Sequence, residues 1–170
     1  MDSVTDRLAL HPFTAEEALR VVDNLPSDSD SWAPDYPLED ELDPLRAFAS
    51  RLGSGADSHP FTTYRIDELT TCQAIGGLGF FYPPDENGTT ELGYGLVAGA
   101  RGRGYATEAL TCAIQIAWDA GAKRIVADTS IENIASQRVM LKTGFIETSR
   151  IDDLVFYAID LARIHLASRS

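Results

Sequence analysis

Residues 96–108 have the sequence LVAGARGRGYATE, in which a glycine- and arginine-rich turn joins a strand pattern to a helical one. Gly102 and Gly104 alternate with Arg101 and Arg103 in this turn. The first N–H groups of a helix have no partners inside it and lie at the positive end of its dipole. Glycines let a phosphate approach the backbone, and arginines add charge and forked donors. The turn therefore predicts a phosphate or pyrophosphate site, with a tight turn bearing solvated arginines as the plainer alternative.

The segments on either side of this turn predict a mixed sheet. Apolar alternation predicts strands, and a stripe of apolar residues every three or four positions predicts helices. Strands are expected at 5–10, 61–66, 73–81, 90–97, 125–128, 145–148 and 154–159. Helices are expected at 14–23, 43–52, 104–120 and 134–143, the second opening with Asp43 as N-cap and Pro44 as its first residue. The order β-α-α-β-β-β-α-β-α-β-β favours an α+β fold, mostly antiparallel, with one β-α-β crossover and helices on both faces.

Length and charge limit the classes of protein that fit. A chain of 170 residues favours a single domain over 1–170. The net charge of −12 argues against a nucleic-acid binder, which needs a basic face. Residues 1–60 hold 13 acidic and 4 basic side chains, so the N-terminal part either is a solvated acidic surface or faces a cationic partner.

Cysteine and histidine usage narrows the expected setting. Cys72 and Cys112 lack metal-ligand or redox spacing, which favours a reducing cytoplasm. The three histidines lie far apart in the sequence and predict no metal site. The first residues resemble no signal peptide, and no apolar run is long enough to span a membrane. The sequence leaves the oligomeric state open, a homodimer included.

Two other phosphate-binding motifs fit the turn poorly. A Walker A loop requires Gly-Lys-Ser/Thr, which the chain lacks. Gly102-x-Gly104 with Asp128 downstream resembles part of a dinucleotide fingerprint. However, residues 91–96 alternate as a hairpin strand does, whereas a buried parallel strand would be nearly continuous in apolar residues. An NAD-binding protein is therefore a weak alternative.

Four short motifs together resemble the GNAT N-acetyltransferase family, and in particular the branch of ribosomal-protein N-terminal acetyltransferases. They are Glu91-Leu92-Gly93-Tyr94, Arg101-x-x-Gly104-x-Ala106, Asn133-x-x-Ser136 and Lys142-x-Gly144-Phe145. The clear match runs from about 73 to 159, and the order of elements fits from residue 5.

The resemblance implies roles for these positions with acetyl-CoA as cofactor. Backbone groups of Leu96, Val97 and Ala98 would pair with the pantetheine arm. The positions implied to hold the pyrophosphate are Arg101, Gly102, Arg103, Gly104, Tyr105 and Ala106. Asn133 would contact the pantetheine, besides serving as a helix N-cap. Ser136 would lie near the sulfur and protonate the departing thiolate, unless it is only a residue of the first helical turn.

The acceptor side is less defined. Glu91 shares the face of Gly93 and Gly95, whose small side chains leave room for an amine, so it is the candidate general base, with an exposed strand carboxylate as the alternative. Backbone N–H groups near Val97 are candidates to stabilise an oxyanion. The candidates for the acceptor pocket are Trp32, Asp35, Tyr36 and Glu39, unless the aromatics only pack the loop.

The resemblance therefore implies an acyl-CoA-dependent N-acetyltransferase. A primary amine would attack the thioester directly in a ternary complex, without a cysteine nucleophile. The acidic N-terminal part favours a cationic acceptor, such as a peptide N-terminus, a polyamine or an amine-bearing small molecule. A second hypothesis is a non-catalytic module that binds acyl-CoA for regulation. The final hairpin has a short turn at Ile151-Asp152-Asp153, which departs from the ribosomal-protein branch and leaves that substrate open.

Overall fold

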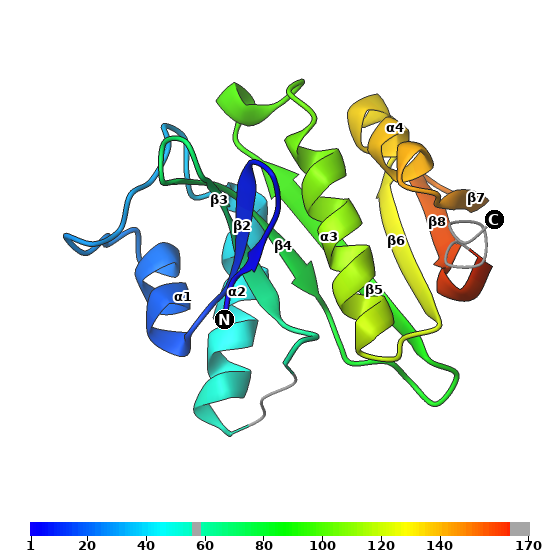
Figure 1. Cartoon of the computed structure of the whole chain (residues 1–170), viewed down its shortest axis with the longest axis horizontal. Coiled ribbons are helices and arrows are strands. Elements are labelled where there is room, and N and C mark those ends of the chain that lie inside the picture. Colours follow the sequence, from blue (N-terminus) through cyan, green and yellow to red (C-terminus); the bar gives the residue numbers. More distant parts are fainter. Residues whose placement is uncertain (56–58, 164–170) are drawn as a thin grey trace.

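The computed structural model describes residues 1–55 and 59–163, and Figure 1 shows their arrangement. The strands are β1 (Ser3–Val4), β2 (Leu8–Pro12), β3 (Thr63–Glu68), β4 (Gln73–Phe80), β5 (Thr89–Leu96), β6 (Arg124–Ser130), β7 (Ile146–Ile151) and β8 (Leu154–Asp160). The helices are α1 (Ala15–Val22), α2 (Glu39–Gly53), the 3-10 turn η1 (Ala98–Ala100), α3 (Tyr105–Asp119) and α4 (Ile134–Lys142). The order matches the sequence prediction, with the two-residue strand β1 added in front.

The eight strands form one mixed sheet in the order β1-β2-β3-β4-β5-β6-β8-β7. Among the described strands, β5 and β6 pair in parallel and the other neighbours pair antiparallel. A parallel pair needs a crossover connection, and α3 supplies it. In Figure 1, α3 lies in front of the sheet and α2 lies behind it. The predicted α+β fold with helices on both faces is confirmed.

Strands β5 and β6 pair only over their first halves. The paired residues run from Thr89↔Arg124 to Glu91↔Val126, whereas β5 continues to Leu96 and β6 to Ser130. Beyond Glu91 the two strands therefore diverge. The side of β5 that faces β6 is left open for another extended group to pair with it.

Helix α2 begins five residues earlier than the sequence predicted, since its first residue is Glu39 instead of Pro44. Its N-cap is Leu38, and Pro44 lies inside the helix instead of at its first position. Glu39, Asp40 and Glu41 fill the first turn, where the helix dipole favours negative charge. Burial of Leu45, Phe48 and Ala49 against the core offsets the hydrogen bond that Pro44 does not donate.

The first hairpin also differs in its bounds from the predicted strand 5–10. The backbone N–H of Thr5 donates to the Leu8 carbonyl at 2.9 Å, which makes a turn of residues 5–8. Strand β2 therefore starts at Leu8, and Arg7 lies in the turn. At the far end of β2, Thr14 and Glu17 form a capping box at the start of α1.

Candidate active site

The glycine- and arginine-rich turn adopts the expected strand–turn–helix geometry. Gly102 and Gly104 have φ of 73° and 83°, in the region that favours glycine, and Gly104 is the N-cap of α3. Gly104 has no side chain to cap the helix, and a Cβ at residue 102 would meet nothing within 4 Å. The backbone around the first turn of α3 is thus open to an incoming group. This geometry fits a pyrophosphate.

Two arginines lie over the ring of Tyr105, the first residue of α3. The guanidinium carbons of Arg7 and Arg103 are 4.6 and 4.8 Å from the ring centroid. Arg7 Nη1 also donates to the Arg103 carbonyl at 2.9 Å, and Arg7 Nε donates to Glu108 at 2.7 Å. Arg7 thereby ties the first hairpin to the turn. No pattern in the sequence marked Arg7, because its partners follow about a hundred residues later.

The buried carboxylate of Glu68 anchors the same cluster. The Tyr105 hydroxyl donates to Glu68 Oε1, and Arg103 Nη2 lies 3.3 Å from the same oxygen. Hydrogen bonds from the hydroxyls of Tyr105 and Thr71 hold the pKa of Glu68 below its usual value. The side chain of Arg103 remains 54% exposed, so its guanidinium is held in place yet accessible to an anion.

Arg101 takes a different position from Arg103. Its Nε donates to the Leu96 carbonyl at 2.9 Å, so the side chain folds back over the end of β5. Arg101 is exposed and also lines the large cavity described below. Its predicted role toward the pyrophosphate stays a prediction.

Backbone groups of β5 alternate between its two neighbours. The Glu91 carbonyl accepts from Phe81, and the Val97 N–H donates to the Ile75 carbonyl at 2.9 Å, so both point to β4. Because successive residues of a strand point to opposite sides, the backbone groups of Tyr94 and Leu96 point toward the gap beside β6. The Val97 N–H itself is therefore not free to stabilise an oxyanion, and that role for other backbone N–H groups near Val97 stays a prediction. The backbone of Leu96 thus lies at the gap, where the resemblance implies that it would pair with the pantetheine arm.

Helix α4 brings Ser136 to the other side of the gap. The Asn133 side chain accepts from the Ser136 N–H at 3.1 Å, which makes Asn133 the N-cap of α4. The Ser136 hydroxyl lies 2.9 Å from the Tyr94 hydroxyl. Burial raises the pKa of Tyr94, so the phenol keeps its proton at neutral pH. Sequence analysis missed Tyr94 as a functional residue, although it lies in one of the quoted motifs.

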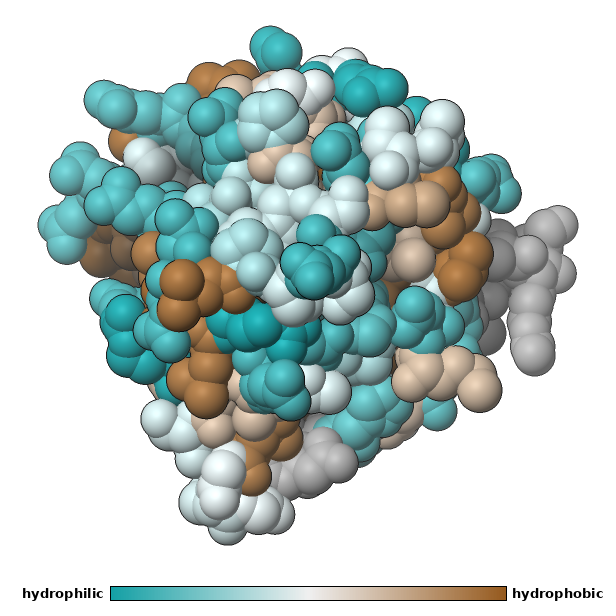
Figure 2. Space-filling view, turned by 90° about the vertical axis from the view of Figure 1, so that its left-hand side faces the viewer, coloured by the Kyte–Doolittle hydropathy of each residue, from teal (hydrophilic) through white to brown (hydrophobic). Residues whose placement is uncertain are grey.

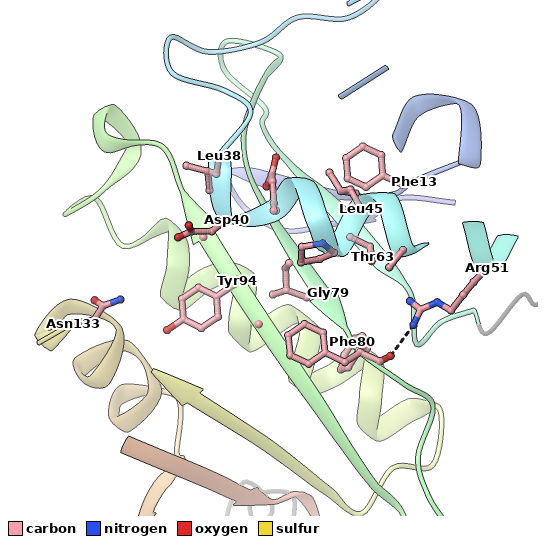
Figure 3. Close-up of a pocket in the computed structure, with 18 of the residues that line it drawn as sticks. Phe13, Leu38, Asp40, Leu45, Arg51, Thr63, Gly79, Phe80, Tyr94 and Asn133 are labelled. Carbon is pink, nitrogen blue, oxygen red and sulfur yellow. Dashed lines mark hydrogen bonds between the residues drawn. The ribbon is translucent and has the colours of Figure 1, made fainter. Parts of the chain in front are cut away.

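A cavity of about 450 Å³ lies between α2 and strands β4 and β5. In Figure 3, Tyr94 and Asn133 lie on one side of it, whereas Leu38, Asp40 and Leu45 of α2 lie on another. Arg51 lies at a further edge and donates to the Phe81 carbonyl at 3.2 Å. The walls are mainly apolar, with Asp40 and Glu41 as their carboxylates among the described residues. A volume of this size is typical of a site for a small molecule.

The predicted acceptor residues gather at a different place. Asp35, Tyr36 and Glu39 line a smaller cavity of about 300 Å³ on the other side of the loop. The Trp32 ring packs edge-on against Tyr36, with centroids 5.5 Å apart. None of these four described side chains lines the larger cavity. Their role toward an acceptor stays a prediction, and packing of the loop accounts for the two aromatics.

Glu91 does not line the larger cavity, although its neighbours Gly93 and Gly95 do. Its carboxylate accepts a hydrogen bond of 3.2 Å from the Tyr82 hydroxyl near the outer end of the hairpin. The glycine face of β5 therefore opens into the cavity at Gly93 and Gly95, which follow Glu91 along the strand. Glu91 as the base stays a prediction.

Glu41 is the carboxylate that sequence analysis missed. It lies in the first turn of α2, and its Oε1 atom is buried without a hydrogen-bond partner among the residues that the structure describes. Burial raises the pKa of Glu41 to about 7, although the Tyr36 hydroxyl and the Leu38 backbone act to lower it. The signal in the sequence was the acidic triplet at 39–41 before the apolar positions 42, 45, 48 and 49.

The surface on one side of the molecule is mainly hydrophilic. Figure 2 shows the left-hand side of Figure 1, where hydrophilic residues cover much of the surface and hydrophobic ones form small separate groups. Within residues 1–55 and 59–163, no group of three or more His, Cys, Asp or Glu could hold a metal ion. In the same residues, no helix has the length and apolar character needed to cross a membrane.

Diverging strands beside a turn that suits a pyrophosphate define an acyltransferase that draws its acyl group from a coenzyme A thioester. Comparison with known proteins agrees with this class. The family model for an acetyltransferase (GNAT) domain matches residues 7–146. The chain belongs to the GNAT family, and it is an N-acetyltransferase that uses acetyl-CoA.

Three similar proteins illustrate the range of the family. The uncharacterized N-acetyltransferase YjdG of Bacillus subtilis is 30% identical over 113 residues, which are 66% of this chain and 67% of YjdG. A ribosomal-protein alanine acetyltransferase of Vibrio fischeri has the same fold, with a TM-score of 0.68 and 13% identity over 94% of this chain and 96% of that one. The microcin self-immunity acetyltransferase MccE, solved with acetyl-CoA and AMP, has a TM-score of 0.61 and 21% identity over 92% and 93% of the chains. The predicted family is thereby confirmed, and the NAD alternative is discarded.

Proposed function

We propose that this enzyme acetylates a primary amine that is cationic when free and binds in the cavity between α2 and strands β4 and β5. The observation that carries the proposal is the cavity itself, whose apolar walls contain Asp40 and Glu41 and which reaches Tyr94 beside the gap. A carboxylate in an apolar wall attracts an ammonium group, whereas the walls accommodate its hydrocarbon part. A peptide N-terminus, a polyamine and a small amine all remain candidate acceptors.

The parts of the chain divide the work of the reaction. Acetyl-CoA, when bound, supplies a thioester whose carbonyl an amine can attack directly. The backbone of Tyr94 and the N–H of Leu96 would hold the pantetheine arm as an added strand, since the Leu96 carbonyl already accepts from Arg101. The first turn of α3 would hold the pyrophosphate. The hydroxyl pair of Tyr94 and Ser136, 2.9 Å apart beside the gap, would donate a proton to the sulfur.

A thiol-release assay tests the proposal. The purified protein is mixed with acetyl-CoA and, in turn, with spermidine, 2-phenylethylamine and an alanine-initiated hexapeptide. Acetylated product, identified by mass, should appear together with free thiol for at least one of the three. Binding of acetyl-CoA without thiol release from any amine would instead support a non-catalytic module.

The reducing cytoplasm stays a prediction, in keeping with the free thiols of Cys72 and Cys112.

A further inference from the structure

We propose that Glu41 is the proton acceptor for the amine, and that it works from the face of the sheet opposite the Tyr94–Ser136 pair. The inference rests on the proposed function, since it concerns the cavity where the amine would bind. An ammonium acceptor must lose two protons to become an amide. One of them ends on the sulfur as the C–S bond breaks and the N–C bond forms. The other leaves through Glu41 to solvent, which balances the reaction.

The strand residue that faces the Glu41 carboxylate is a glycine, Gly77. A Cβ at residue 77 would lie 2.6 Å from Glu41 Oε2, so only glycine leaves this space. Gly77 pairs across the strands with Gly95, where a Cβ would lie 2.8 Å from Leu38 Cδ1. Two facing glycines thus let the first turn of α2 settle onto the sheet. The carboxylate is thereby held against β4, one strand from the gap.

The position of Glu41 relative to Tyr94 follows from strand alternation. Side chains of consecutive strand residues point to opposite faces, so Tyr94 lies on the face opposite to that of Gly95. Tyr94 reaches Ser136 of α4 on its face, whereas the glycine face meets Glu41 and Leu38 of α2. Glu41 and the Tyr94–Ser136 pair therefore approach the cavity from opposite faces of the sheet. An amine between them can lose a proton on one side as the sulfur gains one on the other.

The hydrogen bonding of Glu41 is incomplete in a way that suits a base. Its Oε1 atom is buried, and within the described part of the chain no donor satisfies it. The Tyr36 hydroxyl comes near enough to influence the carboxylate, yet Tyr36 Oη also lacks a well-formed hydrogen bond there. A buried carboxylate oxygen without a donor is costly. The ammonium group of an acceptor in the cavity would supply the missing donor.

The charges around Glu41 come from several elements. The other charged residues that line the cavity are Asp40, Arg51 and Arg101. Arg65 and Asp67 act on the neighbouring Tyr36 through their charges. Arg65 and Asp67 of β3 pair with each other at 2.7 Å, and Arg51 donates to a backbone carbonyl. Desolvation is the largest influence on the pKa of Glu41, which is raised to about 7. A base with a pKa near the working pH is the most effective one.

The first test compares Glu41→Gln with the wild type on whichever of the three amines the wild type acetylates. We expect kcat to fall about 100-fold at pH 7, the lower end of the usual range for loss of a general base. The affinity for acetyl-CoA, measured by calorimetry, should stay within about threefold because the pyrophosphate turn is untouched. The matched control is Asp43→Asn on the exposed side of α2, whose carboxylate is 93% exposed.

The pH profile separates a base from a structural residue. In the wild type, kcat should rise as Glu41 ionises around pH 7. Glu41→Gln should lack this rise, and its deficit should shrink as the pH nears the pKa of the amine, because a neutral amine needs less help. Glu41→Asp should recover part of the rate. Gly77→Ala, which displaces the carboxylate but keeps it, should reproduce the loss even if Glu41→Gln folds poorly.

Two outcomes would overturn different claims. Turnover that Glu41→Gln and Gly77→Ala leave unchanged, with the rise near pH 7 intact, would overturn the role of Glu41 and keep the proposed function. Absence of turnover with all three amines in the wild type would overturn the function on which the inference rests.

Discussion

The two sides of the cavity are built in different ways. The cofactor side consists mainly of backbone, namely the open edge of β5 and the first turn of α3, and its parts lie within residues 92–108. The acceptor side consists of side chains of α2, brought onto β4 and β5 over facing glycines. A backbone site is encoded locally, whereas a side-chain site depends on how distant elements pack. Variants on the two sides should therefore have different effects.

The largest expected effect concerns stability on the acceptor side. In the folded protein the pKa of Glu41 is about 7, against 4.5 without perturbation, so the folded state loses stability as the pH rises from about 4.5 to 7. Glu41→Gln removes this loss and should raise the free energy of unfolding at pH 8 by up to about 3 kcal/mol. At pH 4.5 the gain should vanish, because the carboxyl is then protonated. Urea unfolding at both pH values measures it.

Asp43→Asn is the control for that measurement, since its carboxylate is exposed. A stability gain of Glu41→Gln that is equal at both pH values would contradict the prediction. It would mean that Glu41 is solvated and that the acceptor side resembles an ordinary surface.

The second effect concerns the cofactor side. Arg103→Glu places a negative charge beside the pyrophosphate and removes the contacts of Arg103 with Glu68 and Tyr105. We expect the affinity for acetyl-CoA to fall by about 2 kcal/mol, roughly 30-fold. Calorimetry measures it, with Arg150→Glu on β7 as a charge-matched control. Unchanged affinity in a folded Arg103→Glu protein would remove the assignment of this turn to the cofactor.

The smallest effect concerns the gap between the two sides. Tyr94→Phe removes the more acidic of the two hydroxyls and should lower kcat about tenfold under saturating acetyl-CoA. Ser136→Ala should lower kcat by less than Tyr94→Phe, since it leaves the phenol in place, and both should affect binding less than turnover. Stopped assays with thiol detection measure both. Equal rates in all three proteins would exclude the hydroxyl pair as the proton donor.

The sequence predicted most of the fold and the local geometry of two parts of the candidate site. The turn at 101–104 and the N-cap at Asn133 were predictable because neighbouring residues determine them. The start of α2 was misplaced because Asp43-Pro44 is a strong helix-start pattern, and burial of Leu45 and Phe48 overrode it. That error concealed Glu41.

Contacts between distant segments also escaped prediction. Tyr94 meets Ser136 only because α4 crosses the gap, and Arg7 meets Glu108 only because β2 lies beside α3 in space. Periodicity places a residue on a face but does not reveal which partner lies opposite. The acceptor loop at 32–39 illustrates the limit, since its residues line a neighbouring cavity.

The bonds of Arg7 would make the N-terminal edge of the sheet respond to a ligand bound at the proposed pyrophosphate site. Arg7 and Glu108 are 101 positions apart, yet they join the first hairpin to the start of α3. A ligand held at that helix start stabilises by mass action each conformation in which the bonds persist. Opening of the hairpin then competes with occupancy of the turn, so amide hydrogens of β1 and β2 should exchange more slowly in the loaded enzyme. Amide exchange at the N-terminal edge would therefore report whether the cofactor is bound.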